Sequence, residues 1–64
     1  MKQKFFDRPV VVYDEDGTCY PDVVEVFIGN NDGESYIADS DDEILFFNEM
    51  STGMIENVMA LLES

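Results

Sequence analysis

The residues of this chain that could carry chemistry are carboxylates, and they are densest in the stretch Asp39-Ser40-Asp41-Asp42-Glu43. Two carboxylates can catalyse glycoside hydrolysis when a concave pocket gives them different affinities for the proton. A chain of 64 residues rarely encloses such a pocket, and acids crowded into a turn are solvated and equivalent to one another. We therefore expect no catalytic residue and predict that the protein is not an enzyme.

The residue types of the chain also disfavour nucleophilic catalysis and metal binding. The chain has no histidine, and its lone Cys19 has no basic neighbour in sequence to activate the thiol. A calcium loop of the EF-hand type needs a ligand at position one when glycine stands at position six. Aligning Gly33 with position six puts Ile28 at position one, and aligning Gly17 puts Val12 there. We expect no metal site and no cofactor.

The charge balance is the most informative property of the composition. Fifteen acidic residues against three basic ones give a net charge of −12, and no base follows Arg8. Such a surface repels phosphates, so we expect neither direct nucleic-acid binding nor docking on an anionic membrane. The missing cations predict instead a partner protein with a basic surface. A protein adapted to high salt would show the same excess of acids, and the sequence leaves that alternative open.

The density of this charge is comparable with that of DNA. A chain of this length has an expected radius of gyration of about 11 Å and a span of roughly 28 Å. Duplex DNA carries about 16 charges over that length, the same order as the net charge of this chain. We therefore expect a DNA mimic that binds the basic nucleic-acid-binding cleft of a DNA-processing or host-defence protein.

The candidate contact residues follow the predicted turns. The acids are Asp14, Glu15 and Asp16 in the first turn, Asp32 and Glu34 in the second, and Asp39, Asp41, Asp42 and Glu43 in the third. Tyr20 and Tyr36 are candidate aromatic contacts. Because successive hairpins place alternate turns at opposite ends of a sheet, we expect the first and third turns to share one rim. Asp22 and Glu25 would lie between or behind them.

Alternation of β-branched and aromatic residues predicts the strands. They are expected at 9–14, 23–29, 34–39 and 43–48, with an extended piece at 18–22 that Pro21 limits to an edge or a bend. Turn-forming residues at Asp16-Gly17 and Asn30–Gly33 separate them. Ser40–Glu43 also fits a capping box, which would start a helix at Asp41. We favour the strand, since the residues that follow it are β-formers.

The tail of the chain has the periodicity of an amphipathic helix. Apolar residues recur there at spacings of three and four, at Met50, Met54, Ile55, Val58, Met59 and Leu62. Asn48 or Ser51 would cap this helix, and Glu49 suits its first turn. The sequence therefore predicts a single α+β domain, 1–64: an antiparallel sheet of three or four strands with one C-terminal helix on one face.

The period-two pattern divides the apolar residues between two sheet faces. The face expected under the helix holds Val10, Val12, Val24, Val26, Ile28, Ile37, Ile44 and Phe46. The opposite face holds Val11, Tyr13, Val23, Phe27, Tyr36, Leu45 and Phe47, with Phe5 and Phe6 left to cover it. An uncovered apolar face predicts a homodimer or a protein partner. The alternative function is therefore an acidic interaction module, or regulatory subunit, that binds through this aromatic face.

The sequence also favours a location inside a cell. No apolar run approaches the ~20 residues that a membrane-spanning helix needs. A lone cysteine excludes an intramolecular disulfide and fits a reducing compartment. We expect a cytoplasmic protein.

The segment Asn30–Glu43, NNDGESYIADSDDE, resembles small phage anti-CRISPR proteins, in which a strand, an Asn-Asp-Gly turn, a return strand and an acidic stretch follow one another. In those proteins the carboxylates occupy the basic cleft in which a CRISPR effector reads its PAM. The resemblance implies this role for Asp39, Asp41, Asp42 and Glu43, in the cytoplasm of an infected bacterium. Phage inhibitors of uracil-DNA glycosylase are similar in size, charge and mixed α/β character, so a DNA-repair enzyme is also an implied target.

Overall fold

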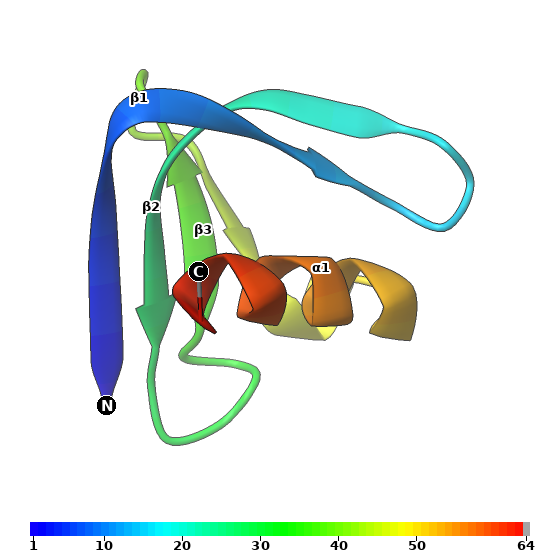
Figure 1. Cartoon of the computed structure of the whole chain (residues 1–64). Helices are drawn as coiled ribbons and strands as arrows, with labels where there is room; N and C mark the ends of the chain where they lie inside the picture. Colours follow the sequence, from blue (N-terminus) through cyan, green and yellow to red (C-terminus); the bar gives the residue numbers. More distant parts are fainter. Residues whose placement is uncertain (64) are drawn as a thin grey trace.

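A four-stranded antiparallel sheet in the order β1-β2-β3-β4 carries one C-terminal helix, so the predicted α+β class is confirmed. The computed structural model describes residues 1–63, and Figure 1 shows the helix lying across one face of the sheet. The elements are β1 (Lys2–Tyr13), β2 (Cys19–Ile28), β3 (Tyr36–Asp39), β4 (Ile44–Phe46), the 3-10 turn η1 (Phe47–Glu49) and α1 (Thr52–Glu63). Neither helix in residues 1–63 has the length and apolar character of a membrane span.

The first hairpin is strongly bent because the register of β1 and β2 slips. The pair Phe5↔Glu25 is followed by Val10↔Val23, so five steps along β1 are matched by two along β2. Pro9 lies in this interval and has no N–H to donate to the ladder. As a result, the distal half of the β1–β2 hairpin leaves the plane of the sheet and curls over α1 (Figure 1).

A bulge in β2 redirects the side chains that follow it. Val23 pairs with Asp39 whereas Glu25 pairs with Ala38, which leaves one residue of β2 extra at this point. Val23 and Val26 have opposite parity in the sequence, yet both are buried, with 2% and 0% of their surface exposed. The prediction that Val23 lies on the outer face is therefore wrong.

The core lies between the sheet, the curled hairpin and α1. Its buried side chains are Val12, Val23, Val26, Ile37, Phe47, Met54 and Val58. Of the side chains expected under the helix, Val12, Val26 and Ile37 are buried in this core. The apolar face of α1 contributes Met54 and Val58. Alternation along the strands and the three-to-four spacing of α1 together build this core.

The orientation of β4 is opposite to the prediction. Residues 44–46 form a strand, so the alternative of a helix from Asp41 is wrong, but the strand is short. Ile37 pairs with Leu45, which places Leu45 against the core and leaves Ile44 49% and Phe46 38% exposed. Phe47, expected on the outer face, is buried in η1. A shift of one residue in register moves every side chain to the other face, and the turn before β4 sets that register.

Ser51 caps the N-terminus of the C-terminal helix. The Met54 N–H donates to Ser51 Oγ at 3.2 Å, and the Ile55 N–H donates to the Ser51 carbonyl at 3.1 Å. The first bond satisfies a donor that has no backbone partner within the helix, and the second is the first backbone hydrogen bond of the helix. Of the two predicted caps, Ser51 is the one used, while Glu49 lies in η1 rather than in the first turn of α1.

Candidate functional site

The β3–β4 turn gathers the third predicted group of acids, Asp39, Asp41, Asp42 and Glu43, which we call the acidic turn. Asp39 organises it: its Oδ1 accepts the N–H groups of Asp41 at 2.8 Å and Glu43 at 3.0 Å. The side chains of Asp41, Asp42 and Glu43 are exposed, and Asp42 has a φ of 63°, a conformation that aspartate tolerates better than most residues. The turn is thus held by its own hydrogen bonds while its other carboxylates face solvent.

Asp22 joins the acidic turn from the neighbouring strand. Its Oδ2 accepts a hydrogen bond from the Ser40 N–H at 3.3 Å and another from the Ser40 hydroxyl. These bonds tie β2 to the turn beyond the last β2–β3 pair, Val23↔Asp39. The structure therefore brings a fifth carboxylate to this end of the sheet, one that the sequence placed only between or behind the turns.

The acids of the first turn lie elsewhere and have structural partners. The Ser51 hydroxyl donates to Asp14 Oδ1 at 2.7 Å, and the Gly53 N–H donates to Glu15 Oε1 at 2.8 Å. Both contacts place negative charge at the N-terminus of α1, where the helix dipole stabilises it. Asp16 Oδ1 accepts the Thr18 N–H at 2.9 Å, and this hydrogen bond lowers the pKa of Asp16.

The first and third turns do not share a rim, contrary to the prediction. Figure 1 shows the β1–β2 turn beside the start of α1, far from the β3–β4 turn at the other side of the molecule. The bend in β1 and β2 is the physical reason, because it carries the end of the hairpin out of the sheet. Asp14, Glu15 and Asp16 therefore form a surface separate from the acidic turn.

The second group of acids lies in the β2–β3 loop, at the opposite end of the sheet from the acidic turn (Figure 1). The Asp32 carbonyl accepts the Asn48 N–H at 3.2 Å, which ties this loop to η1. The Glu34 carboxylate accepts from the Asn30 N–H and the Asn31 side-chain amide, each at 3.4 Å. The side chains of Asp32 and Glu34 are exposed.

The two candidate tyrosines face different environments. Tyr20 is half-buried and packs against the core. Tyr36 lies on the outer face between Phe27 and Phe46, with ring centroids 5.2 and 6.0 Å away. Its hydroxyl donates to Glu25 at 3.2 Å, and burial together with this nearby carboxylate raises the pKa of Tyr36.

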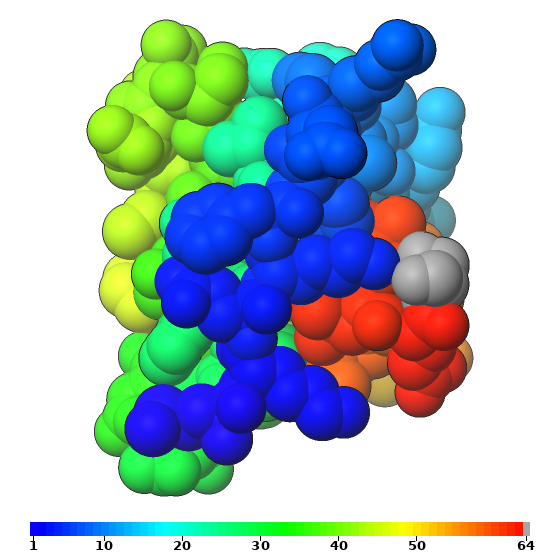
Figure 2. Space-filling model, turned by 60° about the vertical axis from the view of Figure 1, so that its left-hand side comes forward, coloured from blue at the N-terminus to red at the C-terminus, as the bar shows by residue number. Residues whose placement is uncertain are grey.

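The three bases all lie on β1, at Lys2, Lys4 and Arg8. Lys4 Nζ donates to the Leu61 carbonyl at 3.1 Å and lies 5.5 Å from the Phe6 ring. A lysine at this carbonyl interacts favourably with the negative end of the helix dipole. Figure 2 shows β1, in blue, as a band between the β3–β4 turn and the end of α1. Positive charge is thus segregated on one strand.

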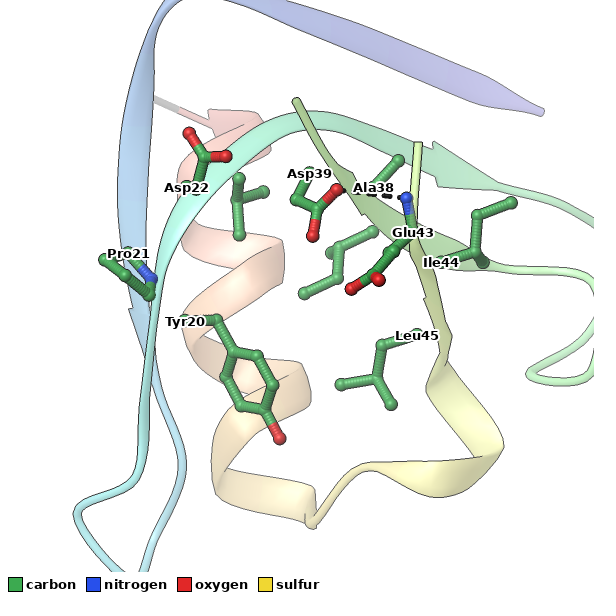
Figure 3. Close-up of a pocket in the computed structure, with 10 residues that line it drawn as sticks. Tyr20, Pro21, Asp22, Ala38, Asp39, Glu43, Ile44 and Leu45 are labelled. Carbon is green, nitrogen blue, oxygen red and sulfur yellow. Dashed lines mark hydrogen bonds between the residues drawn. The ribbon is translucent and has the colours of Figure 1, made fainter. Parts of the chain in front are cut away.

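A cavity of about 260 Å³ lies beside the acidic turn (Figure 3). Its lining residues are Tyr20, Pro21, Asp22, Val23, Ile37, Ala38, Asp39, Glu43, Ile44 and Leu45. It lies where the pairing of β2 with β3 ends, next to the bulge in β2. Sequence reasoning missed it, and Pro21 next to Asp22 was the only signal of a bend there.

Within residues 1–63, no group of three or more His, Cys, Asp or Glu side chains has an arrangement that could hold a metal ion. No family model, no curated protein and no solved structure matches this chain. The site must therefore be interpreted from its own geometry and charge.

Proposed function

We propose that this protein is a non-enzymatic DNA mimic that occupies the basic nucleic-acid-binding cleft of another protein. The observation that carries the proposal is the segregated charge: net −12 on a body of 26 × 26 × 23 Å, with all three bases on β1. Duplex DNA carries about 15 charges over 26 Å of its axis. The protein thus presents a charge density of the same order as the polyanion that it would replace.

The acidic turn is the proposed centre of the contact. Its backbone N–H groups donate hydrogen bonds to the carboxylates of Asp39 and Asp22, which fix the turn, so little conformational entropy is lost when it binds. The exposed carboxylates are free to pair with lysine and arginine side chains of the partner. The surrounding negative field would also accelerate the encounter, since electrostatic steering raises association rates at low salt.

The class of partner follows from this chemistry. A cleft that binds the DNA backbone offers several cations in one concave surface, which is what a compact group of carboxylates complements. A CRISPR effector or a DNA-repair enzyme has such a cleft, and the resemblance of Asn30–Glu43 to anti-CRISPR proteins favours the first. The protein would then act in the cytoplasm of an infected bacterium.

The test is capture of the partner by immobilised protein from a bacterial lysate, followed by elution with duplex DNA. The variant Asp39→Asn/Asp41→Asn/Asp42→Asn/Glu43→Gln keeps the acceptor oxygens of the turn but changes the net charge from −12 to −8. Four ion pairs, three at exposed carboxylates and one at the half-buried Asp39, at about 0.5 kcal/mol each predict a loss of about 2 kcal/mol, or more than about tenfold in affinity.

The matched control is Asp7→Asn/Glu49→Gln/Glu56→Gln/Glu63→Gln, which makes the same change in net charge at exposed positions outside the acidic turn. We expect this control to bind nearly as well as the parent protein. Equal weakening of the two variants would show that only total charge matters, and would refute the acidic turn as the contact.

One observation favours a second candidate function, an interaction module that binds through the outer sheet face. Phe5 is 67%, Ile44 49% and Phe46 38% exposed on that face, beside Tyr36, whose ring stacks on Phe27. Under this alternative, Phe46→Ser would abolish capture while the four-amide variant would still bind. The same capture experiment therefore separates the two functions.

A further inference from the structure

The cavity beside the acidic turn is built where the sheet opens. The β2–β3 pairing runs from Phe27↔Tyr36 to Val23↔Asp39, and the chain of β2 before Val23 follows β1 instead. The gap between this part of β2 and β4 is the cavity of about 260 Å³. Pockets that enclose drug-sized ligands measure roughly 300–1,000 Å³, so this volume suits a single side chain better.

The lining of the cavity combines apolar and acidic residues. The buried side chains of Val23 and Ile37 contribute to its lining, and Tyr20 and Leu45 reach toward each other across it (Figure 3). Three acidic residues, Asp22, Asp39 and Glu43, are also among its lining residues, and its lining includes no lysine or arginine. The complementary occupant therefore has an apolar stem and a positively charged end.

The arrangement of acceptors favours arginine over lysine. The turn engages Asp39 through Oδ1 and Asp22 through Oδ2, and Glu43 uses its backbone N–H rather than its carboxylate in the bond to Asp39. The Asp39 and Glu43 carboxylates both turn toward the cavity in Figure 3, and the planar guanidinium has five donors with which to reach the two of them. The Tyr20 ring offers a flat surface on which a guanidinium can stack.

We propose that this cavity receives one arginine side chain of the basic partner, an assignment that rests on the proposed function. The acidic turn provides the general attraction, and the cavity fixes the position of one residue. It would place an arginine stem between Tyr20 and Leu45 and its guanidinium beside the carboxylates of Asp39 and Glu43. The acidic turn thereby gains a specific anchor that a uniform negative surface lacks.

The experiment needs no partner protein. The ¹⁵N-labelled protein is titrated at low salt with Nα-acetyl-arginine amide, and the backbone amide resonances are followed by NMR. We expect saturable shifts centred on Tyr20, Ile44 and Leu45. The matching citrulline derivative, which is neutral and of nearly the same shape, should produce no saturable shift there, and the lysine derivative should bind several-fold more weakly.

Two variants with the same net charge locate the site. Asp22→Asn/Glu43→Gln changes the lining of the cavity and should weaken arginine binding at least about fivefold. Asp41→Asn/Asp42→Asn changes the same turn outside the lining and should weaken it less than about twofold, by reduced field alone. An unchanged fold is checked in each case by the remaining amide resonances.

Several outcomes would overturn the assignment. These are shifts spread evenly over all acidic residues, equal weakening by the two variants, or equal binding of the arginine and lysine derivatives. If arginine does not bind specifically in the cavity while the protein still captures a partner that DNA displaces, this inference is refuted and the proposed function stands. If the cavity binds arginine but no DNA-binding protein is captured, the proposed function falls instead.

Discussion

Replacement of Gly53 by alanine tests whether Glu15 acts as a structural acid rather than as part of a binding surface. Gly53 is the second residue of α1, and its N–H donates to Glu15 Oε1 at 2.8 Å. A Cβ at this position would lie 2.5 Å from Glu15 Cγ and 2.6 Å from Oε1. The carboxylate must therefore leave the helix N-terminus when the methyl group is added.

Two effects of similar size oppose each other in this variant. Alanine in place of a helical glycine stabilises by up to about 1 kcal/mol. Loss of a carboxylate at the helix N-terminus costs about 0.3–1 kcal/mol. We expect Gly53→Ala to change stability by less than about 0.7 kcal/mol in the parent protein. In a Glu15→Ala background the clash is gone, and the same change should stabilise by about 1 kcal/mol, or about 4–8 °C in Tm.

The assay is a double-mutant cycle measured by urea unfolding and by thermal unfolding followed by circular dichroism. Ala60→Gly is the control, because Ala60 lies on an exposed position of α1 well after its first turn. It should cost about 1 kcal/mol in both backgrounds. Equal effects of Gly53→Ala with and without Glu15 would refute the reasoning. Glu15 would then be a surface acid that does not stabilise the helix N-terminus.

Two further predictions concern individual residues. Asp42 has a φ of 63°, so Asp42→Val should destabilise by about 1–2 kcal/mol while Asp42→Asn should be nearly neutral, as measured by urea unfolding. Burial and the Glu25 carboxylate raise the pKa of Tyr36 above 10.0. In a Tyr13→Phe/Tyr20→Phe background, an absorbance titration should therefore show Tyr36 ionising at a higher pH than free tyrosine. Glu25→Gln should bring the pKa of Tyr36 back toward 10.0. The folded state retains this proton more strongly, so the corresponding stability is complete below about pH 10 and is lost as pH rises through the pKa of the folded state. Ionisation at the ordinary pH would contradict the contact.

Local patterns predicted the elements of this fold but not their curvature. Alternating residues such as Val12 and Val26 indicated strands, and the spacing of Met54 and Val58 indicated the helix, because each pattern has its own period. The extra residue between Val23 and Glu25 and the long step from Phe5 to Val10 have no comparable signal. They depend on how three strands and a helix pack together.

The same limit applies to the candidate site. The composition of Asp39–Glu43 was enough to predict an exposed acidic turn, and the structure places these residues together. The position of Glu15 at the start of α1 could not be predicted, since the two residues that meet, Glu15 and Gly53, are joined only by the curl of the hairpin. The register of β4, which exposes Ile44 rather than Leu45, was not predicted correctly. One residue more or less in the preceding turn moves every side chain of the strand to the other face of the sheet.

The most direct measurement is the affinity of the captured protein for duplex DNA in the presence of increasing concentrations of this chain. A mimic that occupies the DNA cleft must raise the apparent Kd for DNA in proportion to its own concentration, without a plateau, and the effect must weaken as ionic strength rises. The four-amide variant of the acidic turn should be needed at more than about tenfold higher concentration for the same effect. Unchanged DNA affinity at a saturating concentration of the chain, with both bound to the same protein at once, would contradict the proposal.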